Sequence, residues 1–365
     1  MSYYGEKGKF SFRDNFCEEI AESDIGEIAD FGSVLGSVFK RVALGTDNPS
    51  KYSELYALAG GISKSGADVF IINDVMPVFR YGINSVDCQC GVYLSGGAKL
   101  RVLFFDKYGI SAENDVKNIY ECNKNIKSEK NGKISQVLHI GDLYFNSIKD
   151  CMGSNFSKSA VISCGNSRIA KIWRKFFTSE KGDVIFQVSE DGERVNCYNT
   201  ELGFISYERL LLAYAVLLWE KGEKVILPHK FHYAGERLAD DLKAEYEYHN
   251  SQNSRKVFEQ RFTLDALYLC VQLMNCGKPL AEVMRKLPKF YTAKREIFSD
   301  FAMNESERTV ISSNGHVNIA KSGKNRLTLT VQSMDAETAG ELCGSWEKLI
   351  LNSKNIRNCS KKMFS

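Results

Sequence analysis

This 365-residue chain has little excess charge and no long apolar run. Its 48 basic and 45 acidic residues leave a formal net charge of only +3, and aromatic residues do not alternate with basic ones as they do in nucleic-acid-binding strands. The most apolar run, 210–219, is far shorter than the ~20 residues that cross a bilayer, and no basic-then-apolar leader opens the chain. We therefore expect a cytoplasmic protein with neither a nucleic-acid nor a membrane partner.

The chain also lacks clustered metal-binding cysteines. Its eleven cysteines are odd in number and scattered, and no secretory leader directs them to an oxidising compartment. Cys88 and Cys90 have no second Cys or His cluster at zinc-ligand spacing. We expect free thiols and no zinc site.

What the chain does contain is an alternation of apolar strands with amphipathic helices, which predicts an α/β fold with more than one core. A polar stretch at 123–133 reads as a first boundary, and Gly222 ends a strong helix. The predicted domains are α/β domain I at 1–128, α/β domain II at 129–222, a shortened α/β domain III at 223–296, and a C-terminal α+β domain at 297–365.

Domain I has the order strand, helix, strand, helix, strand, with strands predicted at 41–44, at 68–72 and in the segment 91–109. The continuous apolar runs favour parallel strands covered by helices on both faces. Ligands of such sheets bind at the carboxyl ends of the strands, where the loops at Gly45 and Ser95 would lie.

The segment 91–109 reads as a strand, a tight glycine turn and a second strand. Ser95 offers a hydroxyl, Gly96 and Gly97 allow close backbone approach, and Lys99 and Arg101 supply positive charge. This composition suits an anion or nucleophile loop. A plain hairpin with solvated basic residues is the alternative.

A second loop, 189–194, follows the predicted strand 182–188. In extended backbone, residues 189, 191 and 193 face one way, so Asp191 and Glu193 would be placed to share a divalent cation such as Mg²⁺. An acidic hairpin turn without an ion is the alternative.

A third loop lies between the predicted strands of the C-terminal domain. The hydroxyl of Ser322, the backbone at Gly323 and the basic side chains of Lys324 and Arg326 would suit a phosphate group. A hairpin turn with solvated charges is again the alternative.

Taken in order, these loops and the scaffold around them resemble the α-D-phosphohexomutase family, which includes phosphoglucomutase, phosphomannomutase and phosphoglucosamine mutase. The similarity is clearest in the stretches Val42-Ala-Leu-Gly-Thr-Asp, Gly66-Ala-Asp-Val, Phe104-Phe-Asp-Lys-Tyr-Gly, Glu208-Arg-Leu-Leu-Leu-Ala and Gly277-Lys-Pro-Leu-Ala-Glu-Val. The resemblance implies successive phosphohexomutase-type α/β domains. It also implies a phosphate-carrying serine, a D-G-D-x-D-R loop for Mg²⁺, a G-E-x-S-G loop that reads the sugar, and a last domain that grips the substrate phosphate.

The sequence departs from the family pattern at each of these sites. By position, Gly97 falls on the phosphoserine and Ser95 on a neighbouring threonine. In the metal loop Ser189 replaces the first aspartate and Glu193 replaces the third, whereas Asp191 and Arg194 are kept. No G-E-x-S-G is present. The last loop keeps Ser322 and Gly323 and gains basic residues.

The resemblance therefore implies a diverged phosphohexomutase that is catalytically impaired, a pseudoenzyme with residual binding of a sugar phosphate or of a protein partner. On this view Mg²⁺ binds weakly if at all. The alternative is an active, atypical isomerase that interconverts hexose 1- and 6-phosphates with Ser95 as its nucleophile. The sequence leaves the oligomeric state open.

Overall fold

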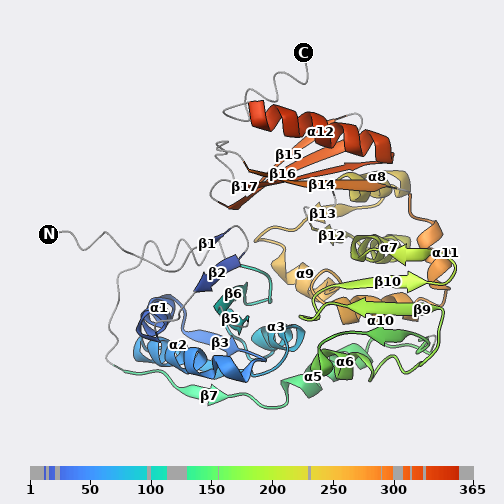
Figure 1. The fold of residues 1–365 in the computed structure, drawn as a ribbon. Helices are drawn as coiled ribbons and strands as arrows, with labels where there is room; N and C mark the ends of the chain where they lie inside the picture. The colour runs from blue at the N-terminus through green and yellow to red at the C-terminus, as the bar shows by residue number, and fades with distance from the viewer. Residues whose placement is uncertain are drawn as a thin grey trace. The chain divides into compact units, whose positions relative to one another are not determined.

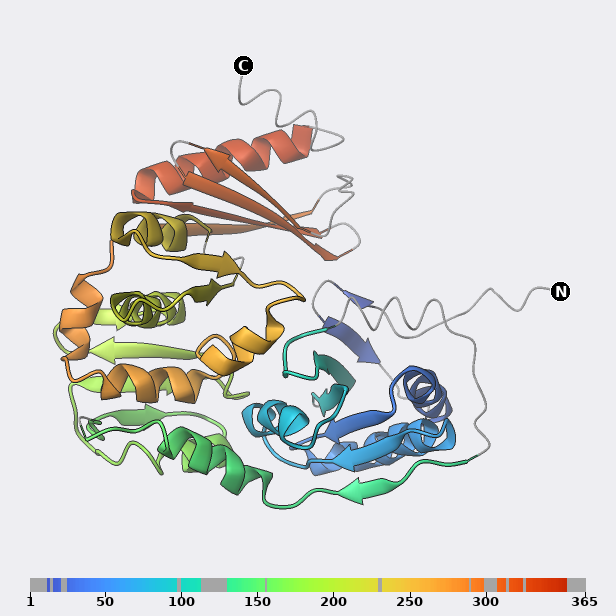
Figure 2. The same cartoon turned by 180° about the vertical axis from the view of Figure 1, so that it is seen from behind.

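The computed structural model describes the chain in two compact units. The described residues are 12–13, 16–20, 25–96, 100–112, 130–154, 156–228, 232–288, 290–298, 307–312, 315–323 and 326–352. Unit 1 comprises residues 1–207 and 251–278, and unit 2 comprises residues 208–250 and 279–365. Figure 1 shows the element order along the chain, and Figure 2 shows the same ribbon from behind.

The larger sheet of unit 1 contains seven of the described strands in the order β1-β2-β6-β5-β3-β4-β7. Their bounds are Phe12–Arg13 (β1), Phe16–Ile20 (β2), Arg41–Gly45 (β3), Asp68–Ile71 (β4), Cys90–Ser95 (β5), Leu100–Asp106 (β6) and Ile134–Gln136 (β7). As predicted, β3 pairs in parallel with both β4 and β5. Strand β6 returns antiparallel to β5, so the segment 91–109 is the hairpin that its glycines indicated.

Helices cover both faces of this sheet, also as predicted. They are α1 (Ile25–Val38), α2 (Tyr52–Lys64), preceded by a helical turn at Pro49–Lys51, and α3 (Met76–Ser85). Val42 and Leu44 face the core shared with α1 and α2. The alternate face carries Tyr93, whose ring lies 5.1 Å from that of Phe79 on α3. The two faces of one sheet therefore have separate apolar partners.

Helices α1 and α2 lie against each other with almost no space at Gly61. A Cβ atom added to Gly61 would lie 1.9 Å from the backbone oxygen of Ala29. Gly60, the next residue of α2, has nothing within 4 Å of the same added atom.

We expect Gly61→Ala to lower the free energy of unfolding by about 1–3 kcal/mol or more, because a backbone atom on α1 must move. Gly60→Ala is the matched control. It should raise stability by about 0.5–1 kcal/mol, since alanine is the better helix former. Thermal unfolding followed by circular dichroism compares the two variants; equal effects at both positions would contradict the close helix contact.

Unit 1 also holds a four-stranded sheet in the order β11-β10-β9-β8. Its strands are Val161–Ser163 (β8), Val184–Val188 (β9), Val195–Asn199 (β10) and Gly203–Ile205 (β11), and its neighbouring helices are α5 (Ile140–Lys149), α6 (Ser167–Trp173), α9 (Ser254–Gln260) and α10 (Ala266–Asn275). Trp173, Phe177 and Phe186 form its buried aromatic core.

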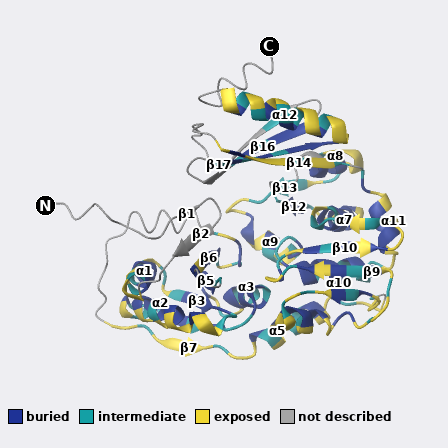
Figure 3. Ribbon diagram, in the orientation of Figure 1, coloured by how far each residue is buried: buried dark blue, intermediate teal, exposed yellow. Residues whose placement is uncertain are grey.

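Unit 2 combines a small parallel pair of strands with a four-stranded antiparallel sheet. The elements are α7 (Tyr207–Glu220), β12 (Val225–Leu227), α8 (His232–Leu242), β13 (Tyr246–Tyr248), α11 (Leu280–Arg285), β14 (Tyr291–Phe298), β15 (Glu307–Ser312), β16 (Gly315–Gly323), β17 (Arg326–Ser333) and α12 (Ala336–Asn352). In Figure 3 the ribbon of α12 carries both the exposed and the buried colour, and Trp346 and Ile350 of this helix join the core of the sheet.

The predicted division into four domains stays a prediction, but two of its boundaries differ from the observed packing. Strand β7 pairs with β4, so the first sheet extends beyond residue 128. Residues 251–278, assigned to domain III, belong to unit 1. Within the described residues no helix is long and apolar enough to cross a membrane, and the cysteines whose side chains are described are free thiols.

Candidate functional site

The loops that follow β3 and β5 meet at one edge of the larger sheet. Both strands run in the same direction, so their carboxyl ends lie side by side. The Nδ2 group of Asn48 donates a hydrogen bond of 3.0 Å to the backbone oxygen of Gly96. Ser95, the last residue of β5, is half-buried beside this contact. Gly97 and Lys99 lie outside the described residues.

The smaller sheet of unit 1 presents its own carboxyl edge to the same place. Arg168, in the first turn of α6, donates to the backbone oxygen of Asp47 at 3.2 Å and lies 3.4 Å from the carboxylate of Asp74. Asn166 caps α6 and donates to the backbone oxygen of Glu190 at 3.0 Å. Burial raises the pKa of Asp74, although Arg168 acts in the opposite direction. Neither Asp74 nor Arg168 was among the predicted site residues.

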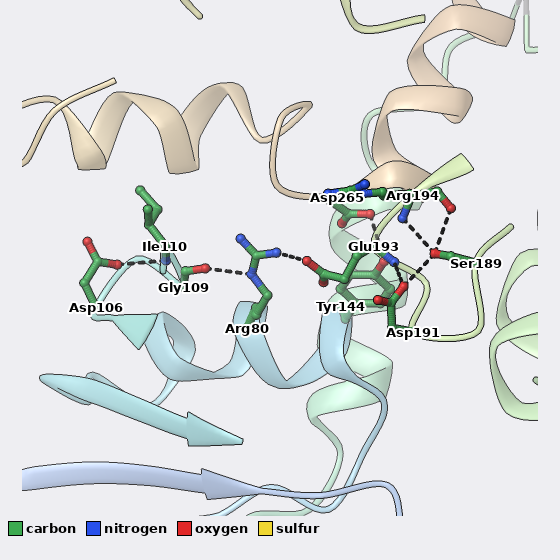
Figure 4. A network of polar contacts seen from close by, with 10 residues as sticks. All are labelled: Arg80, Asp106, Gly109, Ile110, Tyr144, Ser189, Asp191, Glu193, Arg194 and Asp265. Atoms are coloured by element: carbon green, nitrogen blue, oxygen red, sulfur yellow. Dashed lines mark hydrogen bonds and ion pairs between the residues drawn. The ribbon is translucent and has the colours of Figure 1, made fainter. Parts of the chain in front are cut away.

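The loop 189–194 is closed by its own hydrogen bonds, as Figure 4 shows. The Ser189 hydroxyl lies 2.6 Å from Oδ1 of Asp191, and the same carboxylate oxygen accepts from the backbone N–H of Glu193 at 3.0 Å. The backbone N–H of Arg194 donates to the Ser189 oxygen at 3.0 Å. The Ser189 hydroxyl therefore ties the loop to itself.

Asp191 and Glu193 do not face one way. Gly192 adopts φ +75° between them, so the backbone there is a turn and not the extended chain that the prediction assumed. Asp191 stays exposed in the turn, whereas Glu193 continues the inward side of β10, two residues before the buried Val195.

Glu193 forms an ion pair with Arg80 of α3 (Figure 4). The side chain of Glu193 is 19% exposed and that of Arg80 is 13% exposed. Arg80 is held in place by a 2.7 Å bond from its Nε to the backbone oxygen of Gly109. Burial raises the pKa of Glu193 to about 7, and Arg80 opposes that shift. The partners are 113 residues apart, and no local signal links them.

The carboxylates of Asp191 and Glu193, as they are arranged, do not fit Mg²⁺. Mg²⁺ requires nearly octahedral oxygen ligands, usually with one or two carboxylates. One carboxylate of the loop pairs with a guanidinium, and the other accepts two hydrogen bonds from its own loop. The described residues contain no group of three or more His, Cys, Asp or Glu side chains placed to hold a metal ion.

A second buried polar centre fixes α10 to α5. Arg261, 8% exposed, pairs with Asp265 at 2.8 Å and donates to the Ser147 hydroxyl at 2.8 Å. Asp265 also caps α10 and accepts from the Tyr144 hydroxyl at 3.1 Å. The Arg261 guanidinium lies 4.8 Å from the ring centre of Tyr81 on α3, so this centre adjoins the helix that carries Arg80.

The predicted phosphate loop of unit 2 is the turn of the β16–β17 hairpin. Gly323 pairs with Arg326 across it, with an irregularity between Lys321 and Gly323. Ser322 lies in β16, and Lys324 is outside the described residues. Arg326 forms an ion pair with Glu296 and lies over the ring of Phe298 at 5.7 Å. A carboxylate therefore already offsets part of the positive charge on which phosphate binding would depend.

Comparison of the fold with solved structures identifies close structural likenesses at low sequence identity. A phosphoglucomutase/phosphomannomutase family protein from Burkholderia thailandensis has a TM-score of 0.70 at 13% identity, with 92% of this chain and 96% of that chain covered. A putative phosphomannomutase from Thermus thermophilus has a TM-score of 0.66 at 14% identity, with coverages of 96% and 100%. An N-acetylglucosamine-phosphate mutase of the α-D-phosphohexomutase superfamily has a TM-score of 0.52 at 10% identity, with coverages of 94% and 97%.

The chain matches no protein-family profile and no curated protein sequence. The family likeness is thus carried by the arrangement of strands and helices over nearly the whole length, and not by overall sequence identity. This agrees with the sequence resemblance, which rests mainly on scaffold stretches. The chain has the fold of the α-D-phosphohexomutases.

Proposed function

We propose that this chain is a phosphohexomutase-fold protein that binds a sugar phosphate in the cytosol and does not transfer phosphoryl groups efficiently. The observation that carries the proposal is the loop 189–194, in which Arg80 pairs with Oε2 of Glu193 and the loop's own donors bond to Oδ1 of Asp191. Phosphoryl transfer depends almost entirely on positioning and charge stabilisation. The mutases named among the solved structures suggest the ligand class, a hexose phosphate.

A second candidate is an active mutase that uses Ser95. The place of Ser95 favours it, because this half-buried hydroxyl ends β5 beside the contact between Asn48 and Gly96. Parallel sheets bind ligands at such strand ends.

A coupled assay separates the two candidates. Glucose 1-phosphate, mannose 1-phosphate and glucosamine 1-phosphate are supplied in turn, and formation of the 6-phosphate is followed. We expect no turnover above the blank, and we expect Ser95→Ala to behave like the unaltered protein. Peptide mass spectra of protein purified from cells should show no phosphate on residues 94–98.

Turnover that disappears in Ser95→Ala, together with phosphate on Ser95 in substantial yield, would establish the active mutase instead. A protein that neither turns over nor binds any of the three sugar phosphates, but co-purifies with a stoichiometric polypeptide, would leave the partner-binding form of the pseudoenzyme.

A further inference from the structure

We propose that the guanidinium of Arg80 is the built-in counter-cation of the loop 189–194 and that it keeps divalent cations out of this loop. The inference rests on the proposed function in one respect: the ion that Arg80 replaces is taken to be Mg²⁺, as in the metal loop of the phosphohexomutases.

The carboxylate of Glu193 points to the buried side of β10. In β10 the inward side chains are Val195, Cys197 and Asn199, all of which are buried. Glu193 lies two residues before Val195, so the strand period turns it to the same side. A carboxylate on that side is removed from water and requires a positive partner.

Arg80 is held in place as the positive partner of Glu193. Its Nε is fixed by Gly109, and its guanidinium lies 5.3 Å from the ring centre of Phe105. One N–H edge is then left directed at Oε2 of Glu193 (Figure 4). Arginine keeps its charge at every physiological pH, so this partner is permanent.

A metal ion at Glu193 would meet the guanidinium of Arg80. The second oxygen of Glu193, Oε1, is buried and has no hydrogen-bond partner among the described residues. Of the two carboxylate oxygens of Glu193, Oε1 is the one to which an ion could bind without displacing Arg80. A divalent ion placed there would lie within a few ångströms of the guanidinium, and two like charges at that separation repel strongly where water is excluded.

The test uses the full-length protein and no sugar phosphate, so its failure is separate from a failure of the mutase assay. Arg80→Met removes the charge and keeps a side chain of similar reach over Phe105. Calorimetric titration with Mg²⁺ and Mn²⁺ should show little binding to the unaltered protein. Arg80→Met should bind at least about tenfold more tightly, because the repelling charge is gone and Glu193 is released.

Two controls identify the cause of that gain. Arg80→Lys keeps a positive charge, and we expect no gain in metal binding. Arg80→Met combined with Glu193→Gln removes the released carboxylate and should cancel the gain. The melting temperature should follow the same order, with Mg²⁺ raising it relative to EDTA in Arg80→Met alone.

If Arg80→Met does not fold, the unaltered protein still tests the proposal. The melting temperature of the unaltered protein should be the same in millimolar Mg²⁺ as in EDTA. Tight Mg²⁺ binding to the unaltered protein that is lost in Asp191→Asn would overturn the proposal, because the loop would then hold a metal with Arg80 present. A folded Arg80→Met with no gain in Mg²⁺ or Mn²⁺ affinity would overturn it as well.

Discussion

Replacement of Arg261 by methionine should destabilise the protein by about 3–5 kcal/mol, because it leaves the carboxylate of Asp265 buried without its counter-charge. The Arg261 side chain is 10% exposed and that of Asp265 is 7% exposed. The variant also removes the donor that satisfies the Ser147 hydroxyl on α5. Urea unfolding followed by far-ultraviolet circular dichroism measures the loss.

A matched control lies six residues earlier in the chain. Arg255 and Glu259 have the same spacing of four residues, but their side chains are 75% and 54% exposed. We expect Arg255→Met to change stability very little, since exposed ion pairs contribute little. An equal loss in the two variants would show that the Arg261 pair has no special role.

Removal of the unpaired negative charge of Asp265 should restore part of the stability that Arg261→Met loses. Asp265→Asn keeps an oxygen that can cap α10 but carries no charge. Arg261→Met combined with Asp265→Asn should therefore be more stable than Arg261→Met alone. Hydrogen exchange in 140–149 and 261–275 should rise in the single variant, because both segments are fixed through this centre.

The sequence predicted the interior of the larger sheet well because its strands are buried on both faces. The continuous apolar runs of β3 and β4 and the glycine turn between β5 and β6 are local signals, and the structure has strands at those places. Exposed edge strands give no such signal. Strand β7 is exposed along its whole length, and β14 carries exposed residues on both sides. Neither has the period-two pattern by which a half-buried strand is recognised.

The candidate site was harder to predict because it is assembled from distant segments. The residue types of the loop 189–194 indicated a place for chemistry, and the loop does lie between two strands. The direction of its side chains depended on the single positive φ of Gly192. The partners Arg80 and Arg168 belong to helices whose local sequence gives only packing information. A long-range ion pair of this kind follows from the tertiary fold and not from spacing.

Binding of a sugar phosphate to unit 2 should be weak, salt-sensitive and nearly indifferent to the sugar. Selection between isomers requires polar groups that pair with particular hydroxyls, and the sequence lacks the family's sugar-reading motif. Titrations with glucose, mannose and glucosamine phosphates, followed by amide NMR shifts, should give affinities within about threefold of one another, a spread well below what hydroxyl-reading sites achieve. Shifts should centre on Gly323.

We expect Lys324 and Arg326 to carry this binding, so their joint replacement by alanine should weaken it at least about tenfold, because charge-assisted hydrogen bonds are the stronger class. Lys294→Ala with Arg295→Ala removes the same charge from β14 and should have little effect. Glu296→Gln should strengthen binding, because Arg326 is then released from its ion pair. Strong preference for one sugar, with shifts that extend to Ser95 and Asp191, would mean that unit 1 contributes to a working site and that the loop 189–194 keeps a role in catalysis.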